Sequence, residues 1–293
     1  MHIDFHVHPQ FVEPGQEIGQ ATIGTKKLDL VSNPQDIGKA LTQTAYNYFQ
    51  RDHVMLPLPE FVRQMDEARI DKVVLLNPAI KGLPVDPMNE GVAGLMDMFP
   101  GRFIGFAGFD PNGGAQAVRE IEHAVEDLGY SGLKSVPSTL EMDINDRRFY
   151  PSYEKAQELE VPILIHTGSV IIKGVRVKHV HPLMVDDVAF DFPDLKIICA
   201  HLGSWQYMDT INMLLHHRNV YADISFWPLN PLYMDLVPWK VLERTLSDKI
   251  LMGSDYPAGQ TPKEAAEAVG RLPVSEEFKE KILGANAVRL LGL

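Results

Sequence analysis

The sequence predicts an α/β fold, a single (β/α)₈ TIM barrel, and two observations lead to this prediction. Short apolar runs typical of buried strands alternate with segments in which apolar residues recur at helical spacing. This alternation is typical of a parallel sheet covered by helices. Eight such runs occur, which favours a closed barrel over an open sheet. A chain of 293 residues can form one such barrel, so we expect one domain over residues 1–293.

The predicted elements follow one another regularly after the first strand. The eight predicted strands are, in order, "HIDFHVH", "DKVVLLN", "RFIGFAGF", "SGLKSVP", "VPILIHT", "LKIICAH", "NVYADIS" and "KILMGSD". Helices are predicted over residues 59–70, 88–99, 115–128, 150–159, 181–190, 205–216 and 233–246. An insert after strand 1, residues 10–59, shows no strand period, and a short helix is expected over 34–48. C-terminal helices follow Ser275, the expected N-cap.

Composition and charge exclude several classes of partner. The chain is 45% hydrophobic and carries a formal net charge of -12, whereas nucleic acids and anionic membranes need a basic surface. The single cysteine, Cys199, excludes an internal disulfide and a cysteine-based zinc site. No apolar run approaches the ~18 residues that span a bilayer, and no secretory segment precedes the first strand. We therefore expect a cytoplasmic protein.

Polar residues end several predicted strands, where the chemistry of such barrels gathers. The first strand ends in His6 and His8, which share a face because they are two residues apart. The fifth ends in His166, the sixth in His201 and the eighth in Asp255. A single histidine at a strand end more often bonds to a loop, but these strands converge on one mouth. The set therefore predicts a shared site.

Imidazole and carboxylate ligands without thiolates favour one divalent metal ion. Zn²⁺ suits them best, and Mn²⁺, Fe²⁺ or Co²⁺ are other occupants. Three histidines and one carboxylate leave a position open for water, whose pKa such an ion lowers to roughly 7. These residue types do not by themselves divide ligand from base between His166 and His201.

Seven segments together resemble the amidohydrolase superfamily. They are "DFHVHP", "GLKSVP", "PILIHTG", "FPDLKIICAHLG", "NVYADIS", "ILMGSDYP" and "NAVRLLGL", and they occur in the family's order from residue 2 to residue 293. The chain is most similar to the amidohydrolase-related branch that contains aminocarboxymuconate-semialdehyde decarboxylase, resorcylate-type decarboxylases and several small hydrolases. The insert at 10–59 is the weakest part of the resemblance.

The resemblance implies a role for each strand-end residue. His6, His8, His166 and Asp255 become the ligands of a mononuclear metal site. His201 becomes a catalytic residue that orients or protonates the substrate, and Asp255 also accepts a proton from the metal-bound water. The resemblance further implies a small-molecule substrate and a homodimer.

Two positions on the fourth strand limit what the resemblance carries over. Binuclear relatives have a carbamylated bridging lysine at the position of Lys134, but this branch has a lysine there without that role. Many relatives read "KLHP" where this chain reads "KSVP", so Val136 replaces an imidazole. The substrate is therefore not transferable.

Candidate substrate contacts are Arg51, Arg176 and Trp205. The two arginines would bind an acidic substrate from the insert and from the loop after strand five, although a charged loop is more commonly solvated. Trp205 follows "HLGS" and is either a pocket wall or a residue that packs at a helix start. Asp223 on the seventh strand is expected to bond to a ligand or to a group of the sixth strand.

Three functions are compatible with these residues. The first is a metal-dependent hydrolase, in which metal-activated water attacks a small amide, lactone or ester. The alternative is a metal-dependent non-oxidative decarboxylase, a carboxy-lyase that protonates the carbon losing CO₂. The sequence slightly favours the hydrolase because that is the broader outcome in the superfamily. A non-catalytic binding barrel is the third, and it predicts the loss of at least one ligand, whereas none is missing.

Overall fold

The protein is described from a computed structural model that covers residues 1–11, 22–23, 55–81, 84–170 and 175–293. Within them, eight strands pair in parallel and in chain order to form one sheet. The strands are β1 (Ile3–Val7), β4 (Lys72–Leu76), β5 (Phe103–Gly108), β6 (Gly132–Ser135), β7 (Ile163–Ile165), β8 (Ile197–Cys199), β9 (Val220–Asp223) and β10 (Ile250–Leu251). All eight predicted strands are therefore confirmed.

Backbone hydrogen bonds between β1 and the chain after β10 close the barrel. Phe5 N–H donates to the carbonyl of Met252 at 2.9 Å, and Asp255 N–H donates to the carbonyl of His6 at 2.8 Å. His8 N–H in turn donates to the carbonyl of Tyr256 at 2.7 Å. These bonds run alternately in the two directions, as in a parallel ladder. The first and eighth strand ends, which carry the predicted ligands, are therefore neighbours.

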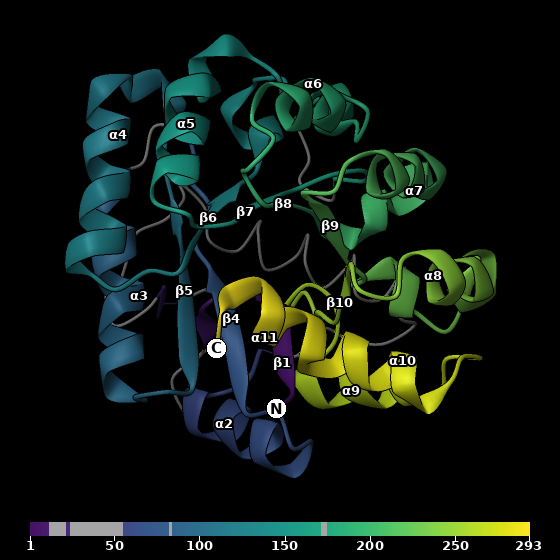
Figure 1. Ribbon diagram of the computed structural model, residues 1–293. Coiled ribbons are helices and arrows are strands. Elements are labelled where there is room, and N and C mark those ends of the chain that lie inside the picture. Colours follow the sequence, from purple (N-terminus) through teal and green to yellow (C-terminus); the bar gives the residue numbers. More distant parts are fainter. Residues whose placement is uncertain (12–21, 24–54, 82–83, 171–174) are drawn as a thin grey trace.

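Helices surround the barrel, and one helix lies across an end of it (Figure 1). The outer helices are α2 (Leu58–Glu67), α3 (Asp86–Met98), α4 (Ala115–Glu122), α5 (Tyr150–Glu158), α6 (Met184–Asp191), α7 (Tyr207–His216), α8 (Trp239–Thr245), α9 (Pro262–Gly270) and α10 (Glu276–Glu280). Helix α11 (Asn286–Leu291) lies across the end of the barrel at which both termini emerge (Figure 1). None of the helices in the described part of the chain is long and apolar enough to cross a membrane.

The apolar core is divided between two clusters. The larger one lies between the strands and the outer helices, and it includes Val73, Leu75 and Met65. The smaller one includes Phe5 and Phe106, whose ring centroids are 5.4 Å apart, together with Leu290 of α11. The barrel interior is thus filled with side chains, as in other (β/α)₈ barrels, and α11 covers the end at which both termini emerge.

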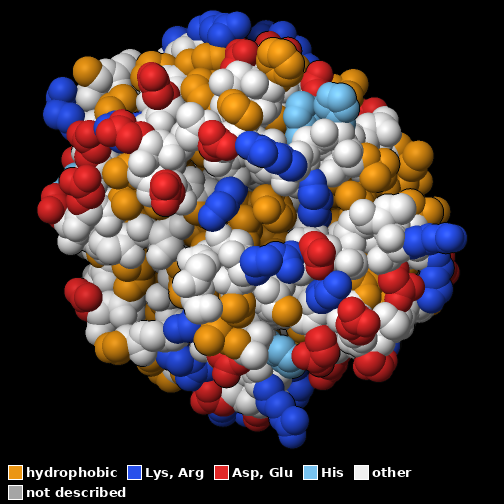
Figure 2. Space-filling view, viewed as in Figure 1, with side chains coloured by type: hydrophobic (Ala, Val, Ile, Leu, Met, Phe, Trp, Pro, Cys, Tyr) orange, Lys and Arg blue, Asp and Glu red, His pale blue; other side chains and the backbone are white. Residues whose placement is uncertain are grey.

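One face of the surface mixes acidic, basic and apolar side chains (Figure 2).

A bulge in β1 breaks the strict alternation that the sequence predicts. The pairing register with β4 shifts between Asp4 and Val7. Phe5 joins the smaller apolar cluster, whereas Val7 joins the larger one, although alternation places them on one face. His6 follows Phe5, and its side chain bonds to Asp223 at the end of β9. The bulge therefore re-aims a candidate ligand, a common use of bulges near sites.

Several element predictions need correction. Helix α7 begins at Tyr207 rather than 205, because the chain from His201 to Ser204 has positive φ angles. Helix α8 begins only after Pro238, since a separate 3₁₀ turn covers Met234–Leu236. Helix α9 was not predicted at all. The insert contains an antiparallel pair, β2 (Gln10–Phe11) and β3 (Thr22–Ile23), and the helix predicted over 34–48 lies outside the described residues.

Candidate active site

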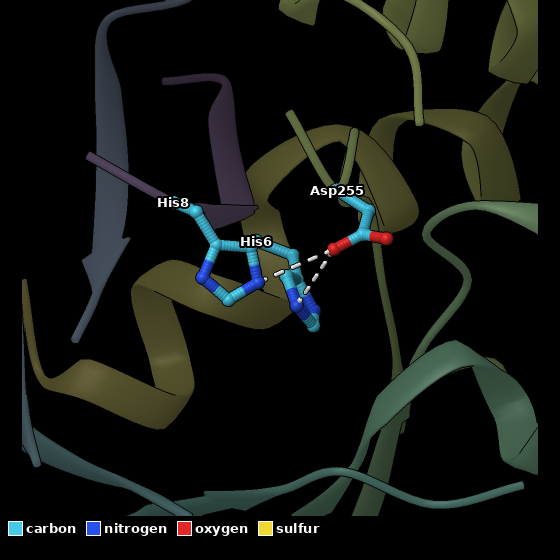
Figure 3. Close-up of side chains that lie close together, drawn as sticks. All are labelled: His6, His8 and Asp255. Carbon is cyan, nitrogen blue, oxygen red and sulfur yellow. Dashed lines mark ion pairs between the residues drawn. The ribbon is translucent and has the colours of Figure 1, made fainter. Parts of the chain in front are cut away.

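Two imidazoles and one carboxylate converge where the first and last strands end. The Asp255 Oδ1 atom lies 3.2 Å from Nε2 of His6 and 3.5 Å from Nε2 of His8. Figure 3 shows both rings directed toward this one oxygen. His6 is fully buried, and Asp255 is 7% exposed. The three residues form a group that could hold a metal ion.

Each of these two histidines has its other ring nitrogen bonded to an acceptor. Nδ1 of His6 lies 2.9 Å from Oδ2 of Asp223, and Nδ1 of His8 lies 3.3 Å from the carbonyl oxygen of Leu76. Carboxylate and carbonyl oxygens only accept, so Nδ1 carries the proton in both rings. Nε2 is then left with a lone pair, and the buried Nε2 of His6 makes no hydrogen bond.

His166 and His201 repeat this arrangement. Nε2 of His166 donates to the carbonyl of Ser169 at 2.8 Å, and Nδ1 of His201 donates to the Ser225 hydroxyl at 2.8 Å. Their remaining nitrogens, Nδ1 of His166 and Nε2 of His201, face each other at 3.2 Å. The His201 ring also lies 4.8 Å from the His6 ring, centroid to centroid. The four histidines therefore turn their lone pairs inward.

Asp223 at the end of β9 organises two of these rings. Its Oδ2 atom accepts from His6, while Oδ1 accepts from the backbone N–H of His201 at 3.0 Å. The Ser225 hydroxyl also donates to Asp223, so it can only accept from His201. The expectation that Asp223 bonds to a group of the sixth strand is thus confirmed. Ser225 was not predicted, although its i, i+2 spacing from Asp223 was a usable signal.

Backbone geometry at the strand ends is also unusual. His201 has a φ of 58° and Asp255 a φ of 57°, a left-handed conformation that is uncommon for residues other than glycine. Such strained residues cluster at functional sites. Gly253 leaves room beside them, because a Cβ atom at this position would lie 2.7 Å from Cβ of His6.

Burial lowers the pKa of the site histidines. The pKa values of His6 and His201 fall well below the usual range, chiefly through desolvation. The pKa of His166 falls to about 3 for the same reason, with the Lys134 charge as the next cause. Desolvation instead raises the pKa of Asp255. The imidazoles of His6, His166 and His201 are therefore neutral at physiological pH, the state in which they bind metals.

Two further buried polar groups lie on β6 and β1. Lys134 is fully buried, its Nζ makes no hydrogen bond, and desolvation lowers its pKa to about 8. Asp4 accepts from the backbone N–H groups of His6 and Ser254, at 3.1 and 2.9 Å, and desolvation raises its pKa to about 7. Asp4 belongs to none of the groups of histidine and acidic residues in the described part of the chain that could hold a metal ion.

Two of the three predicted substrate contacts lie in the described part of the chain, and both are exposed. Arg51 is outside the described residues. Arg176 is exposed and forms no ion pair with another described residue. Trp205 is 50% exposed and stacks on Trp227, with ring centroids 5.3 Å apart. It follows His201 in the same 3₁₀ segment.

Solved structures share this fold. An uncharacterised TIM-barrel protein from Bordetella bronchiseptica has a TM-score of 0.75 and 24% identity, over 99% of this chain and 98% of that chain. A dihydroxybenzoic acid decarboxylase from Polaromonas sp., with bound manganese and 2-nitroresorcinol, has a TM-score of 0.68 and 19% identity, over 100% and 97%. These likenesses confirm the (β/α)₈ fold.

Curated relatives include two kinds of lyase. A 2-amino-3-carboxymuconate-6-semialdehyde decarboxylase from Dictyostelium discoideum is 24% identical over 70% of this chain and 66% of its own length. A gamma-resorcylate decarboxylase from Polaromonas sp. is 24% identical over 79% and 86%. A 2-keto-4-carboxy-3-hexenedioate hydratase from Sphingobium sp. is 29% identical, but over only 39% of each chain.

The match to a family model covers almost the whole molecule. The model described as amidohydrolase, Amidohydro_2, matches residues 3–293, which include every strand of the barrel and all five strand-end residues. This agrees with the superfamily that the seven sequence segments resemble. The chain therefore belongs to the amidohydrolase family and is an enzyme of that superfamily.

Proposed function

We propose that this protein is a metal-dependent, non-oxidative decarboxylase of a small carboxylated molecule. The metal part rests on the orientation of four imidazoles, each of which has one ring nitrogen bonded to an acceptor outside the group. The lone pairs of His6 and His8 face Asp255, and those of His166 and His201 face each other. Lone pairs and a carboxylate oxygen repel one another unless a cation lies between them. Metal binding is also characteristic of the family, and one neighbour holds manganese.

The proposed ligands are those expected from the sequence. His6, His8 and Asp255 supply Nε2, Nε2 and Oδ1, and His166 supplies its inward nitrogen. The donor set suits Zn²⁺ or Mn²⁺. Such an ion, when bound, would attract the oxygen atoms of the substrate and stabilise negative charge that develops on them.

Decarboxylation requires a group that delivers one proton to carbon. The bond to the carboxylate carbon breaks, its electron pair stays on the carbon of the substrate, a proton joins that carbon, and CO₂ leaves. Nε2 of His201 can take up a proton while its Nδ1–H stays bonded to Ser225. The Asp223 carboxylate, bonded to that hydroxyl, stabilises the imidazolium. His201 is thus positioned to collect a proton and return it.

The relatives favour decarboxylation over the hydrolase that the sequence slightly favours. Two of the three curated relatives described above are decarboxylases, and their matches cover 70% and 79% of this chain. The third is a hydratase, which adds water without releasing CO₂. Hydration is therefore the competing reaction that an experiment must exclude.

The test is a direct comparison of products. Metal-loaded protein is incubated in D₂O with a panel of hydroxybenzoates and unsaturated carboxylates, lactones and amides, and CO₂ and products are measured. We expect stoichiometric CO₂ and one deuterium at the carbon that carried the carboxylate. Turnover of a lactone, an amide or a double bond without CO₂ would overturn the proposal in favour of hydrolysis or hydration.

The substrate contacts form a separate part of this proposal. Arg51 and Arg176 are proposed to attract the carboxylate, and Trp205 to contact an unsaturated or aromatic body. With the substrate identified, Arg176→Ala should raise KM and leave kcat nearly unchanged, because such a contact binds ground and transition states alike. Unchanged kinetics would instead favour a solvated loop.

A further inference from the structure

We propose a second metal site on the outer surface, formed by Asp186, His216 and His217. Asp186 lies on α6, His216 is the last residue of α7, and His217 follows it. Each of the three offers one ligand atom, and these atoms lie within 4.8 Å of one another. Histidine side chains lie at the surface in the region of α6 and α7 (Figure 2). The site does not depend on the proposed function.

The geometry of the three side chains suits a transition metal. Nε2 of His217 lies 2.6 Å from Oδ1 of Asp186, so this nitrogen and oxygen already face each other. The rings of His216 and His217 are 4.7 Å apart, centroid to centroid, and nearly perpendicular. Two imidazoles and one carboxylate form the donor set of many catalytic zinc sites, which leave positions open for other ligands.

A cavity of about 360 Å³ adjoins the three side chains. The coordination positions of the ion that these side chains leave open would face this cavity. Asp186 and His216 line it, together with Asp187, Asp191 and Arg147, whose guanidinium pairs with Asp191 at 3.2 Å. Asn145 donates to Asp187, and Tyr150 donates to Asp191 at 2.7 Å. Of the three carboxylates, Asp186 is therefore the one that has no side-chain partner outside the proposed ligand set among the described residues.

A simple pair between a histidine and an aspartate is the alternative explanation, and the chain contains one for comparison. Nδ1 of His123 lies 2.7 Å from Oδ2 of Asp127 within one exposed helical segment. Among the described residues, no second imidazole lies within ligand distance of that pair. The pair does not line the cavity beside Asp186, nor the cavity beside Asp66 and Arg102. Of these two pairs, the one at Asp186 has both a third ligand and an adjoining cavity.

His216 and His217 of the proposed site lie at the end of the barrel where β9 begins, opposite the candidate active site. His216 ends α7 just before β9 begins at Val220, whereas His201 and Asp255 follow the ends of their strands. The partial negative charge at the C-terminus of α7 favours a bound cation. An ion here would link α6 to α7, so we expect it to stabilise the helical ring rather than take part in the reaction.

Equilibrium dialysis of the chelator-treated, full-length protein against Zn²⁺ tests the proposal. Wild-type protein should bind two equivalents per chain. His216→Gln should lose the outer equivalent, with its affinity reduced at least about 10-fold, and should keep the central equivalent and full activity. His6→Asn should lose the central equivalent and keep the outer one. His123→Gln, the matched control, should keep both.

Three results would overturn the proposal. One is a single equivalent in wild-type protein that disappears in His6→Asn. Another is a second equivalent that survives both His216→Gln and Asp186→Asn. The third is a second equivalent that disappears in Lys134→Met, because this would place the second ion at the barrel centre. None of these results bears on whether the protein releases CO₂, so the two proposals fail independently.

Discussion

At the scale of single residues, Asp223 connects the two halves of the candidate site. One carboxylate oxygen fixes the ring of His6, and the other bonds to the backbone of His201 and the hydroxyl of Ser225. The same side chain therefore sets which nitrogen of a proposed ligand and of a proposed proton carrier faces the substrate. Outer partners of this kind orient ligands and raise their basicity.

Asp223→Asn should therefore weaken two functions at once. The amide keeps the shape but has an NH₂ group that cannot accept, so at least one of these bonds is lost. We expect central Zn²⁺ affinity to fall about 10–100-fold, with a loss of turnover even at saturating metal. Chelator competition and steady-state rates measure both. Asp4→Asn is the matched control, because Asp4 bonds to backbone N–H groups, and it should lose far less metal affinity.

A second prediction separates His201 from the ligands. A positioned acid or base contributes roughly 10²–10⁴-fold to a rate. His201→Asn should keep the fold and the central metal and lose turnover in that range, whereas His166→Asn should lose metal as well. Metal analysis and rates on both purified variants test this. A metal-free His201→Asn beside a metal-loaded His166→Asn would mean that the two roles are exchanged.

The sequence predicted which residues gather in the site but not how they are oriented. His6, His8, His166, His201 and Asp255 could be found because polar residues that end apolar strands are conspicuous. The acceptors that fix the imidazoles could not, because they include the backbone carbonyls of Leu76 and Ser169. Any residue type supplies a carbonyl, so no side-chain pattern marks it.

At the scale of elements, α9 shows a signal that pattern reading overlooked. The segment begins "TPKE", and Thr261 and Glu264 form a complete capping box: Thr261 Oγ1 accepts from the Glu264 N–H, and Glu264 Oε2 accepts from the Thr261 N–H. Ser275, by contrast, was predicted as an N-cap and is confirmed by its bond from the Phe278 N–H. Strands β2 and β3 could not be predicted because two residues are too few to show a period.

Thr261→Ala should cost about 0.5–2 kcal/mol of the free energy of unfolding, because it removes one half of the capping box. The site side chains do not contact Thr261, so metal affinity and turnover should be unchanged. Urea unfolding of the metal-free protein measures the cost. Thr245→Ala on α8 is the control, since its exposed hydroxyl bonds only within its own helix, and its effect should stay within about 0.5 kcal/mol. Equal costs for both variants would contradict the capping argument.

At the scale of the whole molecule, the barrel was predictable because each unit repeats the same physical pattern. An apolar strand must be covered on both faces, and eight strands of this kind close on themselves. The closing contacts were not predictable, because the hydrogen bonds between β1 and residues 252–256 join the two ends of the chain. Those same contacts bring His6 next to Asp255, so the closure of the fold also assembles the site.

Closing the site buries ionisable groups, and this gives the metal-free protein a defined response to acid. The histidines His6, His166 and His201 have pKa values below their ordinary 6.5, so below pH 6.5 the unfolded chain binds protons that the folded chain does not. Each such proton lowers stability as the pH falls. Asp4 and Asp255 have raised pKa values, so the folded state holds up to two protons that the unfolded state releases, with the opposite effect.

The unfolded state gains about three protons on the histidines, whereas the folded state holds between one and two on the carboxyls. The unfolded state is therefore ahead by about one to two protons between pH 6 and pH 5. The free energy of unfolding of the metal-free protein should therefore fall by about 1.4–2.7 kcal/mol per pH unit in this range. Urea unfolding at several pH values measures the slope. His201→Asn removes one of the three histidine protons and should lower this slope by about 1.4 kcal/mol per pH unit. A metal-free protein that gains stability on acidification would show that the two buried carboxyls outweigh the histidines, and that protonating the barrel centre does not oppose folding.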